Sequence, residues 1–414
     1  MKTLGKYSFG MGDRFGAEGK AQLNAVLKAR QKGIVITPVW NKSHREHLTV
    51  HTTPETVLTE ARNAVESMGF KDSFFVDADH IGLDFVDDYI EYCDFFTIDV
   101  AKYIGQAPNQ EEKQQFLQFV KAYQNSIYIP GIERSISLSE NELNEIVNTF
   151  LLSSLKASEV YQHIFRKKRG DFVVEVSIDE VSKPQSPVEL FFILASLAFY
   201  KVPVSTIAPK FTGRFNKGID YEGDLQKFEK EFGEDLQVLS FAQNEFGLPE
   251  NLKLSIHSGS DKFSLYPIMN RLVKKHNAGL HVKTAGTTWL EEITVIAESS
   301  SEGFLFALNL YEKSLRRFEE LTSPYPDVLN IDQNKLPTAS SLEQSGKENF
   351  AKALRHEPGS TNFNPHLRQL MHCAYKVAAE VKEAFYEPLS LHRKSIEEKV
   401  TENLFEKHIK PIFF

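Results

Sequence analysis

The sequence predicts an α/β fold, a (β/α)8 TIM-like barrel followed by a C-terminal helical extension. Eight short runs rich in β-branched and aromatic residues alternate with stretches of helical periodicity. Such alternation indicates parallel strands, because each return to the same end of a sheet needs a crossover helix. A doubly wound open sheet is the alternative, but no GxGxxG fingerprint follows the first run.

The predicted strands are short apolar runs that end in polar or turn-forming residues. They cover residues 34–39, 74–76, 95–99, 127–129, 172–178, 202–207, 252–257 and 280–283. Three helix starts lie between them, each with a capping residue: Thr53, which precedes Pro54, Ser139 and Ser186. Strands separated by capped helices are the expected pattern of a barrel.

The chain is predicted to divide near residue 300, with a barrel catalytic domain at 1–300 and a helical extension packed on it at 301–414. A bare barrel needs about 250 residues. Beyond residue 300 the strand pattern stops, a helix at 302–321 is broken by prolines, and residues 340–364 are polar. Residues 367–405 return to helical spacing.

Composition excludes several classes of function. Hydrophobic residues make up 41% of the 414 residues and charged residues 25%, as in soluble globular proteins. A net charge of −8 with dispersed Lys and Arg argues against nucleic acid as a partner, and no apolar run approaches the ~20 residues of a membrane helix. Cys93 and Cys373 form no CxxC motif and the first residues lack a signal-peptide core, so a cytoplasmic location is expected. The sequence leaves the oligomeric state open.

Three histidines, His80, His257 and His281, each end or nearly end a predicted strand beside carboxylates or lysines. In a barrel the functional groups lie at the C-terminal strand ends. Three imidazoles from separate strands would suit a divalent metal with an open coordination position. The alternative is that they are hydrogen-bonded core residues. A second set, His44, His47 and His51, is interpreted as surface histidines.

Strand alternation predicts which acids face the barrel interior. Asp77 and Asp79 share a face, and Glu175, Ser177 and Asp179 form a polar row opposite an apolar one. A polar inner row on an otherwise apolar strand indicates that functional groups face the barrel interior.

Four cationic residues follow the later strands and form a predicted rim at the barrel mouth. They are Lys210, Arg214, Lys262 and Lys283. Such a rim would suit a carboxylate or a phosphate. The alternative is ordinary solvated charge.

Several motifs together make the chain resemble the tagaturonate epimerase family. They are SFGMGDRFG at 8–16, VDADHI at 76–81, EVSIDE at 175–180, APKFTGRF at 208–215, IHSGSDKF at 256–263, HVKTAGT at 281–287 and RQLMH at 368–372. The likeness spans almost the whole chain, and the two histidine motifs at 256–263 and 281–287 are its most specific parts.

The resemblance implies a divalent-metal-dependent barrel enzyme that interconverts D-tagaturonate and D-fructuronate in hexuronate catabolism. The metal ligands would be His80, His257 and His281, with zinc, manganese, cobalt and nickel all compatible. Asp79 would be the proton acceptor. The donor would be Glu175, which faces inward by strand parity, or Glu180, which lies nearer the strand end.

The substrate pair differs at C4, which is β to the ketone, so simple enolisation cannot invert it. A retro-aldol route can, with Asp79 removing the C4 hydroxyl proton and Lys262, Lys283 or Arg214 anchoring the substrate carboxylate. An oxidation–reduction route would need bound NAD. Two alternatives stay open: a metal-dependent aldolase or ketose isomerase acting on another sugar acid, and a non-catalytic sugar-acid-binding protein.

Overall fold

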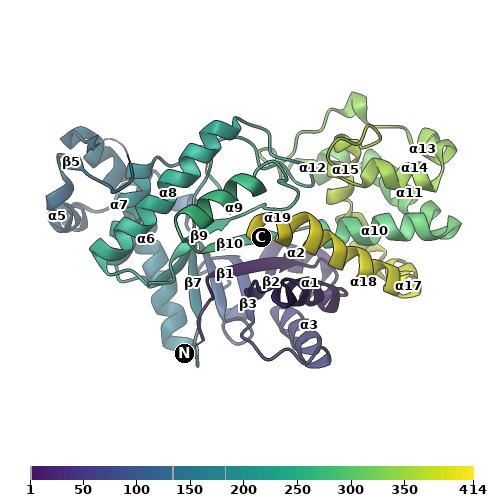
Figure 1. The fold of residues 1–414 in the computed structure, drawn as a ribbon, viewed down its shortest axis with the longest axis horizontal. Helices are drawn as coiled ribbons and strands as arrows, with labels where there is room; N and C mark the ends of the chain where they lie inside the picture. The colour runs from purple at the N-terminus through teal and green to yellow at the C-terminus, as the bar shows by residue number, and fades with distance from the viewer. Residues whose placement is uncertain (1, 133–134, 182) are drawn as a thin grey trace.

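The computed structural model describes residues 2–132, 135–181 and 183–414 and has a closed barrel of eight parallel strands at its centre (Figure 1). Around the barrel the strands follow the order β1-β10-β9-β8-β7-β4-β3-β2. Their bounds are β1 Tyr7–Gly12, β2 Ile36–Ser43, β3 Phe75–Ile81, β4 Phe95–Asp99, β7 Val173–Ser177, β8 Val204–Ala208, β9 Lys253–Ile256 and β10 Leu280–Thr284. The predicted fold class is therefore confirmed.

One predicted barrel strand is wrong, and one barrel strand was not predicted. Residues 127–129 do not enter the barrel; β5 (Ser126–Ile127) pairs with β6 (Ile136–Ser137) in a separate two-stranded antiparallel sheet. The missing strand is β1, whose glycines weaken the β signal. At Gly10 an added Cβ would lie 2.9 Å from the Asn41 side-chain oxygen and 3.0 Å from Cγ of Lys283. Glycine is needed there so that neighbouring strands can place large polar side chains in the interior.

Helices surround the barrel and connect its strands. Those of the barrel region are α1 Gly19–Gln31, α2 His44–Val50, α3 Pro54–Ser67, α4 Asp87–Ile90, α5 Gln110–Phe119, α6 Glu140–Lys167, α7 Pro187–Phe199, α8 Leu225–Phe246, α9 Tyr266–Lys275 and α10 Thr287–Ser299. Ser139 and Ser186 form capping boxes as predicted, whereas the Thr53 side chain makes no capping hydrogen bond. No helix in the described part of the chain is long and apolar enough to cross a bilayer.

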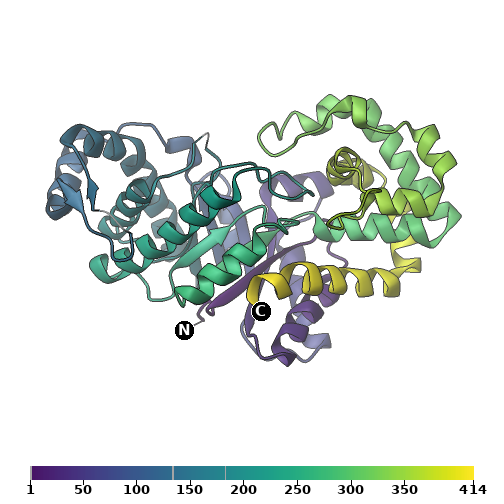
Figure 2. The ribbon, with the colours of Figure 1, turned by 45° about the horizontal axis from the view of Figure 1, so that its top comes forward.

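The chain is helical from residue 301 onward. It contains α11 Ser301–Arg316, α12 Phe318–Thr322, α13 Ala339–Ser345, α14 Lys347–Leu354, α15 Pro365–Cys373, α16 Tyr375–Glu380, α17 Lys382–Leu391, α18 Arg393–Glu402, a π-helical segment at Asn403–Ile409 and α19 Lys410–Phe413. In Figure 2 these helices extend to one side of the barrel and the chain then returns across it. The division of the chain at residue 300 stays a prediction.

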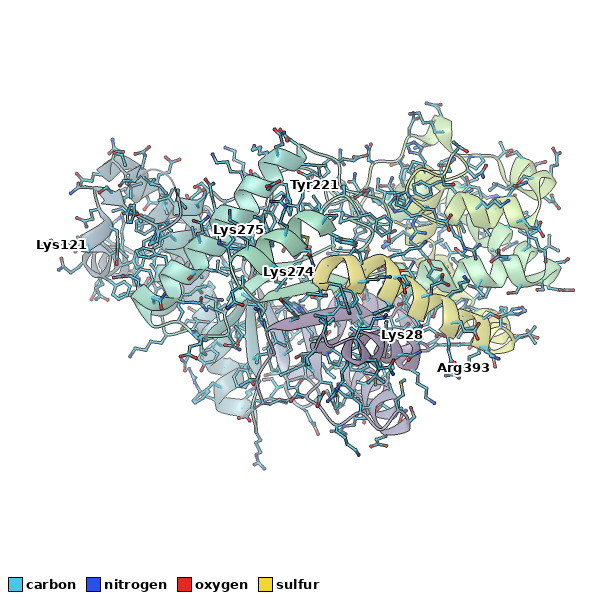
Figure 3. The ribbon with its side chains drawn as sticks, in the orientation of Figure 1. Lys28, Lys121, Tyr221, Lys274, Lys275 and Arg393 are labelled. Carbon is cyan, nitrogen blue, oxygen red and sulfur yellow. The ribbon has the colours of Figure 1, made fainter. Side chains whose placement is uncertain are left out.

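The end of the chain covers the first strand of the barrel. From α18 to α19 it packs against α1 and α9, and the rings of Tyr7 and Phe413 lie 5.1 Å apart. Asn270 of α9 donates a hydrogen bond to the carbonyl of Ile412 at 2.8 Å. Figure 3 shows this run passing from Arg393 to the neighbourhood of Lys274. This run lies where a barrel's eighth outer helix would be, while α10 packs on α11, α14 and α18.

The barrel interior is apolar at the N-terminal ends of the strands and polar towards their C-terminal ends. The apolar plug consists of Leu4, Val39, Phe75, Phe95 and Val173. Side chains alternate along each strand, so the residues two positions further along face the same interior. In β3, β4 and β7 these are Asp77, Thr97 and Glu175, all buried. Water is thus excluded below the site, and polar chemistry is confined to the C-terminal end.

Candidate active site

Lys283 of β10 lies at the centre of a buried group of carboxylates. Its Nζ is 2.7 Å from Asp77 Oδ2, 2.8 Å from Asp79 Oδ1 and 2.8 Å from Glu175 Oε1. Burial lowers the pKa of Lys283, but the three carboxylates outweigh it and hold that pKa well above its usual value. Lys283 is therefore a permanent cation that keeps three acids, two from β3 and one from β7, close together.

Glu175 is a fully engaged hydrogen-bond acceptor. Besides Lys283, its Oε1 accepts from Thr97 at 3.2 Å and lies 2.7 Å from His257 Nε2, while its Oε2 accepts from Thr206 at 2.7 Å. Burial raises the pKa of Glu175, but Lys283 and His257 outweigh burial and hold it well below its usual value. This carboxylate is ionised and fixes the orientation of the His257 ring.

His80 reaches the barrel mouth because β3 is irregular at its end. The residue has φ of 56°, in the left-handed region, and the pairing of β3 with β4 shifts register between Ala78 and Ile81. Alternation alone would place Asp79 and His80 on opposite sides of the sheet. Instead His80 Nε2 lies 3.9 Å from Asp79 Oδ1, and the rings of His80 and His257 are 5.0 Å apart.

The residues at the mouth fit a divalent metal. Ligand atoms of His80, Asp179 and His257 lie within 4.8 Å of one another, and His80, Asp99 and Glu180 form an overlapping group. Among the described residues neither Nδ1 of His80 nor Nδ1 of His257 makes a hydrogen bond of good geometry, although Asp99 Oδ2 lies 3.6 Å from the first and Asp179 Oδ1 3.3 Å from the second. Mixed imidazole and carboxylate donors suit zinc and its first-row neighbours.

The surrounding acids favour positive charge at this place. Burial lowers the pKa of His80, but Asp79 and Asp99 outweigh it and raise that pKa to about 9. For His257, Asp179 and Glu175 outweigh burial and raise the pKa to about 10. A proton or a metal ion would satisfy the same field, and a metal would have to displace these protons.

His281 lies in the barrel interior and forms a different contact. Its Nδ1 is 2.8 Å from Ser8 Oγ, its ring is 5.3 Å from that of Phe95, and it is 0% exposed. Burial lowers its pKa to about 3, so it is neutral. The structure brings His80 and His257 together, but the possible metal-binding groups found among the described residues do not include His281.

In the group with His80 and His257, Asp179 takes the position that sequence analysis gave to His281. The sequence signal for Asp179 was its place in the inward-facing polar row of its strand. Of the second histidine set, His47 is buried and pairs with Thr52 at 2.9 Å, so the surface interpretation is wrong for this residue.

The four predicted anchoring cations differ in what they contact. Lys283 belongs to the carboxylate group. Lys262 is buried, and its Nζ donates to the carbonyls of Asn216, Ile219 and Ser260, each at 2.8 Å. Arg214 is exposed and donates to the carbonyl of Leu329 at 2.7 Å. The half-buried Lys210 lies on the loop after β8, as Arg214 does.

A parallel barrel with buried acids, a cationic lysine and paired histidines at its C-terminal mouth defines an enzyme of acid–base chemistry on a small polar molecule. The chain belongs to the tagaturonate epimerase family, whose model matches residues 2–412. It is an isomerase of the epimerase class, in agreement with the resemblance noted in the sequence.

Two relatives illustrate the similarity. The tagaturonate/fructuronate epimerase of Thermotoga maritima is 29% identical over 418 residues, covering 97% of this chain and 79% of that protein. A glycerol-complexed crystal structure of fructuronate-tagaturonate epimerase from Cohnella laeviribosi has a TM-score of 0.82 at 24% identity, covering 99% of this chain and 82% of that one. Its native form has a TM-score of 0.80. The crystal structures establish the likeness of fold.

Proposed function

We propose that the protein interconverts D-tagaturonate and D-fructuronate by inverting C4 with the help of a divalent metal. The observation that carries this proposal is the convergence of Asp79, His80, His257 and Asp179 at one barrel mouth. The substrates follow from the family and from the named activity of the Thermotoga relative.

His80, His257 and Asp179 would hold the metal, with His281 as the alternative third ligand predicted from the sequence. A bound divalent ion would act as a Lewis acid towards charge developing on the ketone oxygen. Metal titration of Asp179→Asn and His281→Asn variants separates the two ligand sets. The variant that loses a true ligand binds metal more weakly, and the other retains the wild-type affinity.

Asp79 would begin the reaction by taking the proton of the C4 hydroxyl. The C4 oxygen becomes a carbonyl, the C3–C4 bond breaks, and its electron pair passes to the C2 ketone to give an enediolate. The other product is a three-carbon aldehyde acid. After the aldehyde turns, C3 adds to its opposite face and the new C4 alkoxide takes a proton. Lys283 supports this step because it retains Asp77 and Glu175 when Asp79 becomes neutral.

Glu180 suits the proton donor better than Glu175. Sequence parity favours Glu175, but both of its oxygens are occupied in the buried group. Glu180 is exposed at the mouth, within the group that contains His80 and Asp99. It can exchange protons with solvent between turnovers, so we assign the donor role to Glu180 and a positioning role to Glu175.

The test is an NMR assay of metal-depleted protein reconstituted with zinc, manganese, cobalt or nickel and supplied with D-tagaturonate. Metal-dependent appearance of D-fructuronate is expected. No conversion with any of the four metals would overturn the proposed function. Substrate deuterated at C4 tests the route, because hydride transfer breaks the C4–H bond and retro-aldol cleavage does not. A primary deuterium isotope effect, or stoichiometric NAD in the purified protein, would rule out the retro-aldol step.

A further inference from the structure

Three cationic side chains from separate elements converge on the ring of Tyr325. Lys376 Nζ of α16 lies 4.7 Å from the ring centroid, Lys217 Nζ of the β8–α8 loop 5.2 Å, and the guanidinium of Arg45 in α2 5.6 Å. Close by, Arg14 stacks over Tyr375 at 4.2 Å. No sequence motif joins these residues, because they are far apart in the chain.

This cationic cluster is formed by Lys217, Lys376 and Arg45 and has no ion-pair partner among the residues that the structure describes. Within the described ranges no carboxylate lies within 4.0 Å of their charged groups, whereas Arg14 is paired with Glu46. Burial, followed by repulsion from Arg14, lowers the pKa of Lys217 to about 8. Gathering like charges at partly buried positions is unfavourable unless an anion joins them. The arrangement therefore suits an anionic ligand.

The cationic cluster lies at the same end of the barrel as the acid–base site, because Lys217 and Arg45 are in the segments that follow β8 and β2. The charge of Glu180 acts on Lys217, and Glu180 belongs to the same group as His80. The cluster is also held in place. Lys262 Nζ binds the carbonyls of Asn216 and Ile219 on either side of Lys217, and the Lys217 backbone N–H donates to Val328 at 2.8 Å. Lys262 thus fixes the loop that carries Lys217.

We propose that Lys217, Lys376 and Arg45 bind the C6 carboxylate of the substrate. This inference rests on the proposed function and adds a binding subsite to it. C3–C4 cleavage leaves the carboxylate on the three-carbon aldehyde acid, which must turn without escaping. Guanidinium and ammonium groups hold a carboxylate by charge-assisted hydrogen bonds, so the fragment is retained at its far end while its aldehyde carbon rotates.

The experiment compares Lys217→Met with wild type on D-tagaturonate and on D-tagatose, which carries an alcohol at C6. Losing one charge-assisted contact corresponds to an affinity loss of about 10- to 100-fold. KM for D-tagaturonate should rise by about that factor, with free aldehyde acid detected by NMR. Any turnover of D-tagatose should be unchanged, and Lys217→Arg should restore retention of the fragment. Lys230→Met, an exposed lysine of α8, is the matched control.

Calorimetric binding of D-tagaturonate to the Asp79→Asn variant, with and without Lys217→Met, gives a second readout that needs no turnover. Weaker binding in the double variant supports the carboxylate site. Equal binding, or an unchanged KM in active Lys217→Met protein, would overturn it while leaving the epimerase proposal intact. An inactive wild type would instead count against the proposed function. Thermal melting of each variant confirms that it is folded.

Discussion

At the residue scale, two consecutive side chains of β3 serve the same site because one of them leaves the regular strand conformation. His80 adopts φ of 56°, which is uncommon for a residue with a Cβ. Strain of this kind persists where surrounding contacts over-determine the conformation. Sequence parity predicts Asp77 and Asp79 in the interior correctly, since both contact Lys283. It could not predict the direction of His80, because the register shift in β3 has no simple sequence signature.

Substitution should distinguish the roles of Glu175 in β7 and Glu180 in the loop that follows β7. Glu180→Gln should lower kcat by about 100-fold or more, in the range expected for loss of a general acid, with little change in stability. Glu175→Gln should lower the free energy of unfolding, because His257 and Lys283 lose a buried anionic partner. Steady-state kinetics and urea denaturation distinguish them. Wild-type kcat in Glu180→Gln would return the donor role to Glu175.

Lys262 is expected to stabilise the protein and to hold in place the loop that carries Lys217. Lys262→Met leaves three buried carbonyls without their donor, and a buried unsatisfied group costs about 1–3 kcal/mol. The free energy of unfolding should fall by several kcal/mol, and KM for D-tagaturonate should rise because Lys217 is no longer held. The half-buried Lys210 provides the comparison, since Lys210→Met should change stability by less than about 1 kcal/mol. Equal stability of the two variants would contradict this role.

At the element scale, the sequence signals were strongest where a strand is apolar and weakest where packing requires glycine. β10 was predicted well because Leu280 and Val282 alternate with polar residues. β1 was missed because its glycines make room for Lys283 and Asn41, a requirement set by neighbouring strands. The cationic cluster at Tyr325 was beyond prediction for a similar reason. Its members come from α2, α16 and a loop, and only the tertiary fold brings them together.

Acidic side chains from several elements surround Lys42 of the barrel strand β2. The charges of Glu18, Glu60 of α3 and Glu292 of α10 act on one another; Glu18 and Glu292 are buried and Glu60 is half-buried. Both carboxyl oxygens of Glu18, and both of Glu292, lack a hydrogen-bond partner in the part of the chain described. Burial, reinforced by Asp13, raises the pKa of Glu18 to about 8. The packing therefore favours protonated carboxyl groups at neutral pH.

This acid cluster predicts a pH dependence of stability. The folded protein binds a proton at Glu18 that the unfolded chain releases above its ordinary pKa of 4.5. Stability should therefore fall between pH 4.5 and about 8, by up to about 1.4 kcal/mol per pH unit for one group. Glu18→Gln should flatten that fall, as measured by urea denaturation across the range. If the free energy of unfolding fell with pH as steeply in Glu18→Gln as in the wild type, the assignment to Glu18 would be disproved.

At the scale of the whole molecule, the buried ion pair between Arg368 and Asp261 connects the C-terminal helices to the loops at the barrel mouth. Arg368 of α15 donates to Asp261 at 2.7 Å and to the carbonyls of Gly218 and Leu354, each at 2.6 Å. Asp261 lies four residues after His257, and Gly218 follows Lys217. One side chain from the helical extension thus contacts the loops after two barrel strands. The sequence indicated that the extension packs on the barrel, but not where it is attached.

Arg368→Met should be strongly destabilising because it leaves the Asp261 carboxylate buried without its main partner. Breaking one side of a buried pair costs about 3–5 kcal/mol. Differential scanning calorimetry should show a lower Tm, and KM should rise as the loop at Gly218 loosens. Arg316, exposed and paired with Glu312 on α11, is the control, with an expected change below about 1 kcal/mol. Similar Tm values for the two variants would refute the fastening role.

The position of α19 has a consequence during protein synthesis. Since the residues from α18 to α19 cover β1 and α1, the first barrel strand has no complete outer layer until α19 has been synthesised. At roughly 5–20 residues per second, the roughly 400 residues from β1 to α19 take roughly 20–80 s to make. Throughout that time the apolar outer surface at the start of the barrel is available to chaperones. A ribosome stalled within α18 would therefore hold a chain that contains every barrel strand but cannot yet complete the outer layer over β1.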